Sequence, residues 1–92
     1  MSWWIYLSDG TDDPPAINIS YNNRRVFNRA IDGGITALYG TTGWDSILIL
    51  EKAISVIPVW EIGSRNYIAR RALRDLLAMA EQHNRGTWSV SP

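Results

Sequence analysis

The sequence has no cysteine, one histidine and one lysine, and its 92 residues sum to a net charge of zero at neutral pH. The absence of cysteine excludes a disulfide framework, a thiolate metal site and a thiol nucleophile. A short chain without disulfides is typical of a reducing compartment, so we expect a protein of the cytoplasm. No apolar run is long enough to cross a bilayer. The neutral balance also gives the whole molecule no general attraction for nucleic acid or membranes.

The charges that are present are unevenly distributed along the chain. Residues 1–51 carry six acidic residues against three arginines, whereas residues 52–92 carry six basic residues against three acidic ones. Eight of the nine cations are arginine, whose planar guanidinium group suits recognition of carboxylate or phosphate. The two halves are complementary in charge, which allows them to meet within one fold or across a subunit boundary. For the excess of arginine over lysine, the alternative explanation is coding bias or ordinary surface pairing.

Aromatic and β-branched residues predict three strands, at residues 2–7, 16–19 and 87–90. A connector with an Asp-Gly pair and two prolines, residues 9–15, separates the first two strands. Both faces of the first strand are apolar, so we expect its second face to need a cover, such as another subunit. The two faces would carry, respectively, Trp3, Ile5 and Leu7, and Trp4 and Tyr6.

Three helices are predicted by capping residues followed by apolar residues at helical spacing. They begin after Ser20, Thr42 and Ser64 and are expected to end at 33–34, at Pro58 and near residue 83. The second helix is apolar around most of its circumference, which indicates burial on several sides or packing against a partner. Residues 59–63 read as a connector or short strand.

These elements give the order β-β-α-α-α-β in a single domain, residues 1–92. We therefore predict an α+β fold, a small antiparallel sheet of about three strands with about three helices on one face. An isolated two-stranded hairpin is marginal, so the last strand should pair with the first.

No catalytic constellation is visible in the sequence, which predicts a protein that is not an enzyme. His83 lies where a helix should end, a position that favours cations for structural reasons. The one acidic cluster, Asp9, Asp12 and Asp13, lacks the spacing of a calcium loop. The glycines do not form a phosphate-binding or dinucleotide-binding motif, so no cofactor or metal is expected.

One segment combines groups suited to a phosphate-bearing ligand where a strand leads into a helix N-terminus. Free backbone N–H groups at such an end favour anions, and an aromatic ring there offers a surface on which a base stacks. The alternative is that the asparagines fix the turn and the serine only caps the helix. The candidate ligand-binding residues of this segment are Asn18, Ser20, Tyr21, Asn22, Asn23, Arg24 and Arg25.

The third predicted helix supplies a second candidate, an arginine-rich flank that includes Arg70 and Arg71. Its alternative is a solvated helix face paired with Asp75 and the acidic half of the chain. The flank consists of Arg65, Asn66, Arg70, Arg71 and Arg74.

A third feature is a surplus of aromatic residues, most of which are expected in the core. More rings than one thin core needs would indicate a homo-oligomer. The rings concerned are Trp3, Trp4, Tyr39, Trp44, Trp60 and Trp88.

The segment Asn18-Ile19-Ser20-Tyr21-Asn22 resembles the Asn-Ile-(Ser/Thr)-(His/Tyr)-Asn segment of a family of small uncharacterised proteins encoded by bacteriophages and prophages. Gly63-Ser64-Arg65-Asn66-Tyr67 is similar to that family's Gly-aromatic-Gly-Asn-Tyr stretch before the last helix, with Arg65 in place of the second glycine.

The resemblance implies an accessory factor in the host bacterial cytoplasm that counters host defence. One hypothesis is that it sequesters a small nucleotide-like immune signal in a homo-oligomer, with Arg70 or Arg71 contributed by a neighbouring subunit. The alternative is an inhibitor that binds and blocks a host protein. A nucleic-acid binder is disfavoured by the zero net charge and by the absence of a helix-turn-helix pattern.

Overall fold

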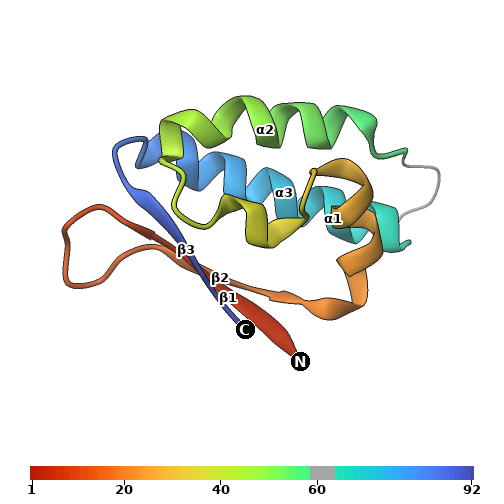
Figure 1. The fold of residues 1–92 in the computed structure, drawn as a ribbon, viewed down its shortest axis with the longest axis horizontal. Helices are drawn as coiled ribbons and strands as arrows, with labels where there is room; N and C mark the ends of the chain where they lie inside the picture. Colours follow the sequence, from red (N-terminus) through yellow and green to blue (C-terminus); the bar gives the residue numbers. More distant parts are fainter. Residues whose placement is uncertain (59–63) are drawn as a thin grey trace.

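The computed structural model describes residues 1–58 and 64–92, and these form a three-stranded antiparallel sheet with helices on one face (Figure 1). The strand order is β2-β1-β3. The predicted α+β fold and its element order are therefore confirmed. The predicted segment 59–63 lies outside the described residues. In chain order the elements are β1 Ser2–Ser8, β2 Ala16–Ser20, the 3₁₀ turn η1 Tyr21–Asn23, α1 Arg24–Ala30, the 3₁₀ turn η2 Ile35–Leu38, α2 Gly43–Val56, α3 Arg65–Gln82 and β3 Thr87–Ser91.

The central strand is β1, because both other strands pair with it. Trp3 lies opposite Ile19 of β2, and Leu7 lies opposite Trp88 of β3. The pairing of the first and last strands is thus as predicted. Alternate side chains of β1 point to opposite faces, so Trp3, Ile5 and Leu7 all enter the core.

Short polar side chains begin the two long helices, as the sequence predicted. Thr42 Oγ accepts a hydrogen bond from the Asp45 N–H at 3.1 Å, and Ser64 Oγ accepts one from the Tyr67 N–H at 3.1 Å. Each cap satisfies a backbone donor that has no partner inside its helix. At its other end α2 stops at Val56, two residues before Pro58.

The first helix differs from the prediction at both ends. Residues 21–23 form a 3₁₀ turn, and the α-helical part covers only Arg24–Ala30. The helix ends at Ala30, three residues before Gly33. The next residue, Ile31, is extended and buries its side chain. Gly33 and Gly34 have φ angles of 85° and 70°, so these glycines serve the turn into η2 rather than the helix terminus.

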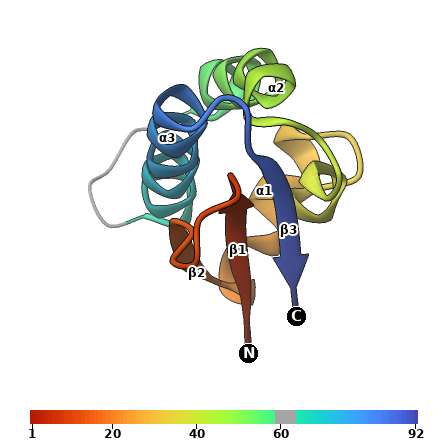
Figure 2. The same ribbon diagram turned by 90° about the vertical axis from the view of Figure 1, so that its left-hand side faces the viewer.

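The core lies between the sheet and the layer of helices, and α2, which packs on α3, contributes Leu50 and Ala53 to it (Figures 1 and 2). This position leaves the outer face of α2 exposed: the exposed fraction is 69% for Trp44 and 78% for Leu48. Burial of α2 on several sides is therefore wrong, because only one face of the helix enters the core. Packing of its outer face against a partner stays a prediction. The expectation that most aromatic residues lie in the core is also wrong, since Trp4, Tyr39 and Trp44 are exposed, Trp3 and Trp88 are buried and Trp60 lies outside the described residues.

Candidate functional site

The segment 18–25 runs from the end of β2 through η1 into α1, and two of its polar side chains bond within the fold. The Asn18 side-chain amide donates to Ser2 Oγ at 2.8 Å and to the Trp3 carbonyl at 3.1 Å. Ser20 Oγ accepts a hydrogen bond from the Asn22 N–H at 3.1 Å. The predicted cap at Ser20 is thus confirmed. Asn18 does not fix the turn as expected, because its amide bonds across to β1 and holds the end of the strand instead.

Two other residues of the segment anchor η1 to the core. The ring of Tyr21 lies against Trp3, with ring centroids 4.5 Å apart and planes at 58°. Asn23 is buried. Trp3 also contacts Phe27 of α1, edge to face, with centroids at 6.2 Å. These contacts hold the turn in a defined position, so the side chains beside it are presented from a rigid base.

The exposed part of the segment borders a hollow of about 310 Å³. Asn22, Arg24 and Arg25 line it together with Tyr21, and the fifth lining residue is Arg65, the first residue of α3. Arg65 was predicted only as part of the α3 flank. It reaches the hollow because η1 packs against α3, a long-range contact that no local sequence signal reveals. We call these five residues the Tyr21 hollow.

The other arginines of α3 lie elsewhere on the surface. Arg70, Arg71 and Arg74 line a second hollow of about 230 Å³ with Tyr67. The Nε atom of Arg70 is buried there without a hydrogen-bond partner among the described residues. Within a single chain, the structure therefore groups Arg65, but neither Arg70 nor Arg71, with the Tyr21 hollow. Asn66 faces α1 across a further hollow that it lines with Arg29.

The basic residues near the Tyr21 hollow lack acidic partners in the part of the chain that the structure describes. Across residues 1–58 and 64–92, the ion pairs consist of a single contact, between Asp9 and His83. Seven of the nine cations fall in residues 24–29 and 65–74. The acidic β1–β2 loop, residues 9–13, lies toward the opposite end of the molecule (Figure 1). Among the described residues, the arginines and the lysine of the basic half thus form no ion pair with the acidic half.

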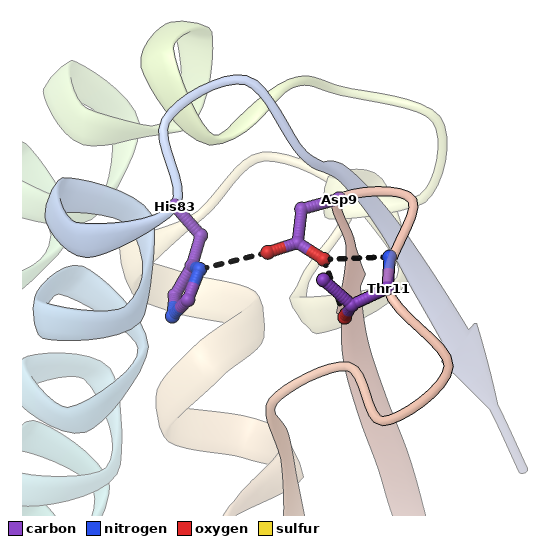
Figure 3. Close-up of polar contacts among 3 residues, drawn as sticks. All are labelled: Asp9, Thr11 and His83. Atoms are coloured by element: carbon purple, nitrogen blue, oxygen red, sulfur yellow. Dashed lines mark hydrogen bonds and ion pairs between the residues drawn. The ribbon is translucent and has the colours of Figure 1, made fainter.

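Asp9 and His83 join the β1–β2 loop to the C-terminal end of α3 (Figure 3). His83 Nδ1 lies 3.0 Å from Asp9 Oδ2, while Asp9 Oδ1 accepts hydrogen bonds from the Thr11 hydroxyl at 2.8 Å and the Thr11 N–H at 3.2 Å. The Thr11 hydrogen bonds, and after them His83, hold the pKa of the Asp9 carboxyl below its ordinary value. The contact explains His83 as a structural residue that closes the loop.

The described residues include no group of three His, Asp or Glu side chains that could hold a metal ion. None of the helices in residues 1–58 and 64–92 has the length and apolar character needed to cross a membrane. No family model, curated protein or solved structure matches the chain. The site is therefore interpreted from its own chemistry.

Proposed function

We propose that the Tyr21 hollow binds a small phosphate-bearing, nucleotide-like ligand, and that the protein sequesters this ligand without chemical conversion. The observation that carries the proposal is the convergence of Arg24, Arg25 and Arg65 on one hollow beside Tyr21. They come from two elements far apart in sequence, and η1 between them is anchored in the core.

The residue types match the parts of a nucleotide. Guanidinium groups bind phosphate oxygens through paired, charge-assisted hydrogen bonds. The Asn22 amide offers both a donor and an acceptor for a sugar or base edge. The exposed part of the Tyr21 ring supplies a surface for base stacking. The hollow, about 310 Å³, is at the lower end of the range for small-molecule sites, which favours a compact ligand.

Sequestration requires tight binding and no catalytic group. A role as a phage-type accessory protein in the bacterial cytoplasm, withdrawing a nucleotide immune signal, is the setting that we propose for this chemistry. It rests on the sequence resemblance and on the arginines of the hollow, which form no ion pair with any residue of 1–58 or 64–92.

The test is thermal unfolding of the purified protein with cyclic nucleotides, linear nucleotides, ADP-ribose derivatives and inorganic phosphate, each added separately. A ligand at ~100 times its dissociation constant stabilises the native state by about 2.7 kcal/mol, a shift of several degrees for a small domain. Arg24→Ala, Arg25→Ala and Arg65→Ala should each remove the shift. Arg85→Ala is the matched control, because Arg85 is exposed and lies between α3 and β3.

The proposal is supported if one nucleotide class raises the unfolding temperature of the wild-type protein and of Arg85→Ala, but not that of the three hollow variants. Equal shifts with inorganic phosphate and with nucleotides would reduce the site to a phosphate site. No shift with any of these compounds, for protein freed of co-purified ligand by refolding, would contradict it.

A second candidate function, binding and blocking a host protein, is favoured by a different observation. Trp44 and Leu48, one turn apart on the outer face of α2, are exposed apolar side chains with exposed fractions of 69% and 78%, and Val56, beyond Lys52, is 54% exposed. Exposed apolar side chains at helical spacing are typical anchors of protein interfaces. Leu48→Asp should abolish the complex with the host protein and leave nucleotide binding intact. Arg65→Ala should abolish nucleotide binding and leave the complex intact.

A further inference from the structure

Among the residues that the structure describes, no strand pairs with the outer edge of β2, which we call the free edge. It lies at one side of the sheet, and residues 16–20 contain no charged residue and no proline, the features that commonly block edge pairing. The opposite edge is different, because Trp88 of β3 exchanges backbone hydrogen bonds with the segment 40–41: Gly40 N–H donates to Trp88 O at 2.9 Å, and Trp88 N–H donates to Thr41 O at 2.8 Å.

The backbone hydrogen bonds fix which groups point outward from β2. Leu7 N–H donates to Pro15 O, and Tyr21 N–H donates to Met1 O. Residues opposite each other alternate between bonded and non-bonded pairs in an antiparallel ladder. Odd-numbered residues of β2 therefore bond to β1, whereas Ala16, Asn18 and Ser20 direct their N–H and C=O groups to the free edge.

Helix α3 flanks this edge across a hollow of about 220 Å³. Four of its residues line the hollow opposite β2: Ile68, Arg71, Ala72 and Asp75. Ile68 is 47% exposed, and Arg71 and Asp75 are exposed. The face next to the free edge thus carries an apolar side chain, a small side chain and one charge of each sign.

Arg71 and Asp75 are one helical turn apart but form no ion pair with each other. The arrangement of acid before base along a helix is the more favourable one, and here the order is reversed. When a second copy of α3 lies antiparallel to the first, Asp75 of each copy lies beside Arg71 of the other, and the two charges attract. The pair is therefore complementary to itself under two-fold symmetry.

We propose that β2 pairs with β2 of a second copy of this chain around a two-fold axis at Asn18, with the two α3 helices side by side. Ala16 of each copy then exchanges backbone hydrogen bonds with Ser20 of the other, and Asn18 with its counterpart. The sheet becomes continuous across both copies. Arg71 and Asp75 form two equivalent ion pairs, while Ile68 and Ala72 fill the space beside them. This interface is independent of ligand binding at the Tyr21 hollow.

The first experiment measures mass in solution by sedimentation and light scattering, with single charge reversals. The wild-type protein should have twice the 10.4 kDa mass of one chain. In a dimer of Arg71→Asp, each of the two contacts would bring two carboxylates together, and in a dimer of Asp75→Arg each would bring two guanidinium groups together. Each variant should therefore be monomeric. Mixing the two variants should restore a mixed dimer, because every contact is then attractive. Arg85→Asp and Glu81→Arg are the matched controls and should remain dimeric.

The second experiment locates the axis, using the fact that the chain has no cysteine of its own. Asn18→Cys should form an intermolecular disulfide under mild oxidation, because bonded antiparallel pairs have Cα atoms about 5.5 Å apart, within disulfide range. Ser91→Cys at the end of β3 is the control and should not cross-link.

Several outcomes would overturn the proposal. Wild-type protein that is monomeric at ~100 µM, about the concentration needed to populate a weak dimer, excludes it. Dimers that persist in both charge variants place the interface elsewhere, for example on the Trp44 face of α2. Failure of the mixed variants to associate would show that the ion pairs are not those inferred.

Discussion

The indole N–H of Trp88 donates a 2.7 Å hydrogen bond to Ser46 Oγ, and both side chains are fully buried. Ser46 in turn donates to the Gly43 carbonyl at 2.8 Å. This relay joins β3 to the first turn of α2. The hydroxyl thus satisfies the buried indole donor and an early carbonyl of the helix, so the relay fixes where α2 sits relative to the sheet.

Ser46→Ala should destabilise the protein by about 1–3 kcal/mol, because the buried Trp88 N–H loses its acceptor. Urea unfolding followed by tryptophan fluorescence measures the change. Ser55→Ala on the same helix is the control: its hydroxyl bonds only to the Lys52 carbonyl at an exposed site, so its cost should be about 0.5 kcal/mol or less. Equal costs for the two variants would refute the assigned role of Ser46.

Gly43→Ala should be destabilising by about 1–3 kcal/mol through overpacking, although helix propensity alone favours alanine. A Cβ atom at this position would lie 2.8 Å from the His83 carbonyl oxygen and 3.0 Å from Asn84 Cα. Both are backbone atoms, so relief requires α2 to move away from the α3–β3 connection. Thermal unfolding measures the loss, and Asp45→Ala in the same turn is the exposed control. A stabilised Gly43→Ala variant would show that the helices shift freely.

The same substitution at two leucines of α2 should have very different effects on stability. Leu50 is fully buried and Leu48 is 78% exposed. Leu50→Ala should cost about 2–5 kcal/mol, from lost burial and the cavity left behind. Leu48→Ala should change the free energy of unfolding of the isolated chain by about 0.5 kcal/mol or less. A large cost at Leu48 for dimeric protein would instead place that side chain in a subunit interface.

Asp9→Asn should reduce the loss of stability in acid. The pKa of Asp9 is lowered in the folded state, chiefly by the Thr11 hydrogen bonds and further by His83. The ionised carboxylate therefore stabilises the fold above its unfolded pKa, and this contribution is lost as the pH falls below 3.8 through the folded value. Urea midpoints measured between pH ~7 and pH ~2 give the comparison. Asp12→Asn, in the same loop, should follow the wild-type curve, and an Asp9→Asn curve parallel to wild type would contradict the prediction.

Much of the fold could be read from short-range patterns. The caps at Thr42 and Ser64 and the alternation along β1 involve residues within a few positions of each other. They can therefore be predicted from local sequence alone. Where a local pattern was outweighed, the prediction was wrong: the Gly33-Gly34 pair indicated a helix end, but burial of Ile31 ended α1 earlier.

The candidate site was only partly visible in the sequence. Tyr21, Asn22, Arg24 and Arg25 are neighbours along the chain, so their proximity was predictable. The cap at Ser20 is one of two alternatives that the sequence offers, and its hydrogen bond to the Asn22 N–H selects it. The bonds of Asn18 to β1 depend on strand pairing, which the local sequence does not reveal. The tertiary structure alone brings Arg65 to the same hollow, since that depends on η1 packing against α3.

The sequence by itself therefore determined the three strands, the three α-helices and their order among the described residues, because capping and periodicity act over one or two turns. Only the tertiary structure decided which faces are covered. The apolar residues around α2 indicate burial on several sides or a partner, yet only one face of the helix enters the core, and Trp44 and Leu48 face solvent. The pairing of elements depends on contacts between distant residues, whose free energies no local pattern encodes.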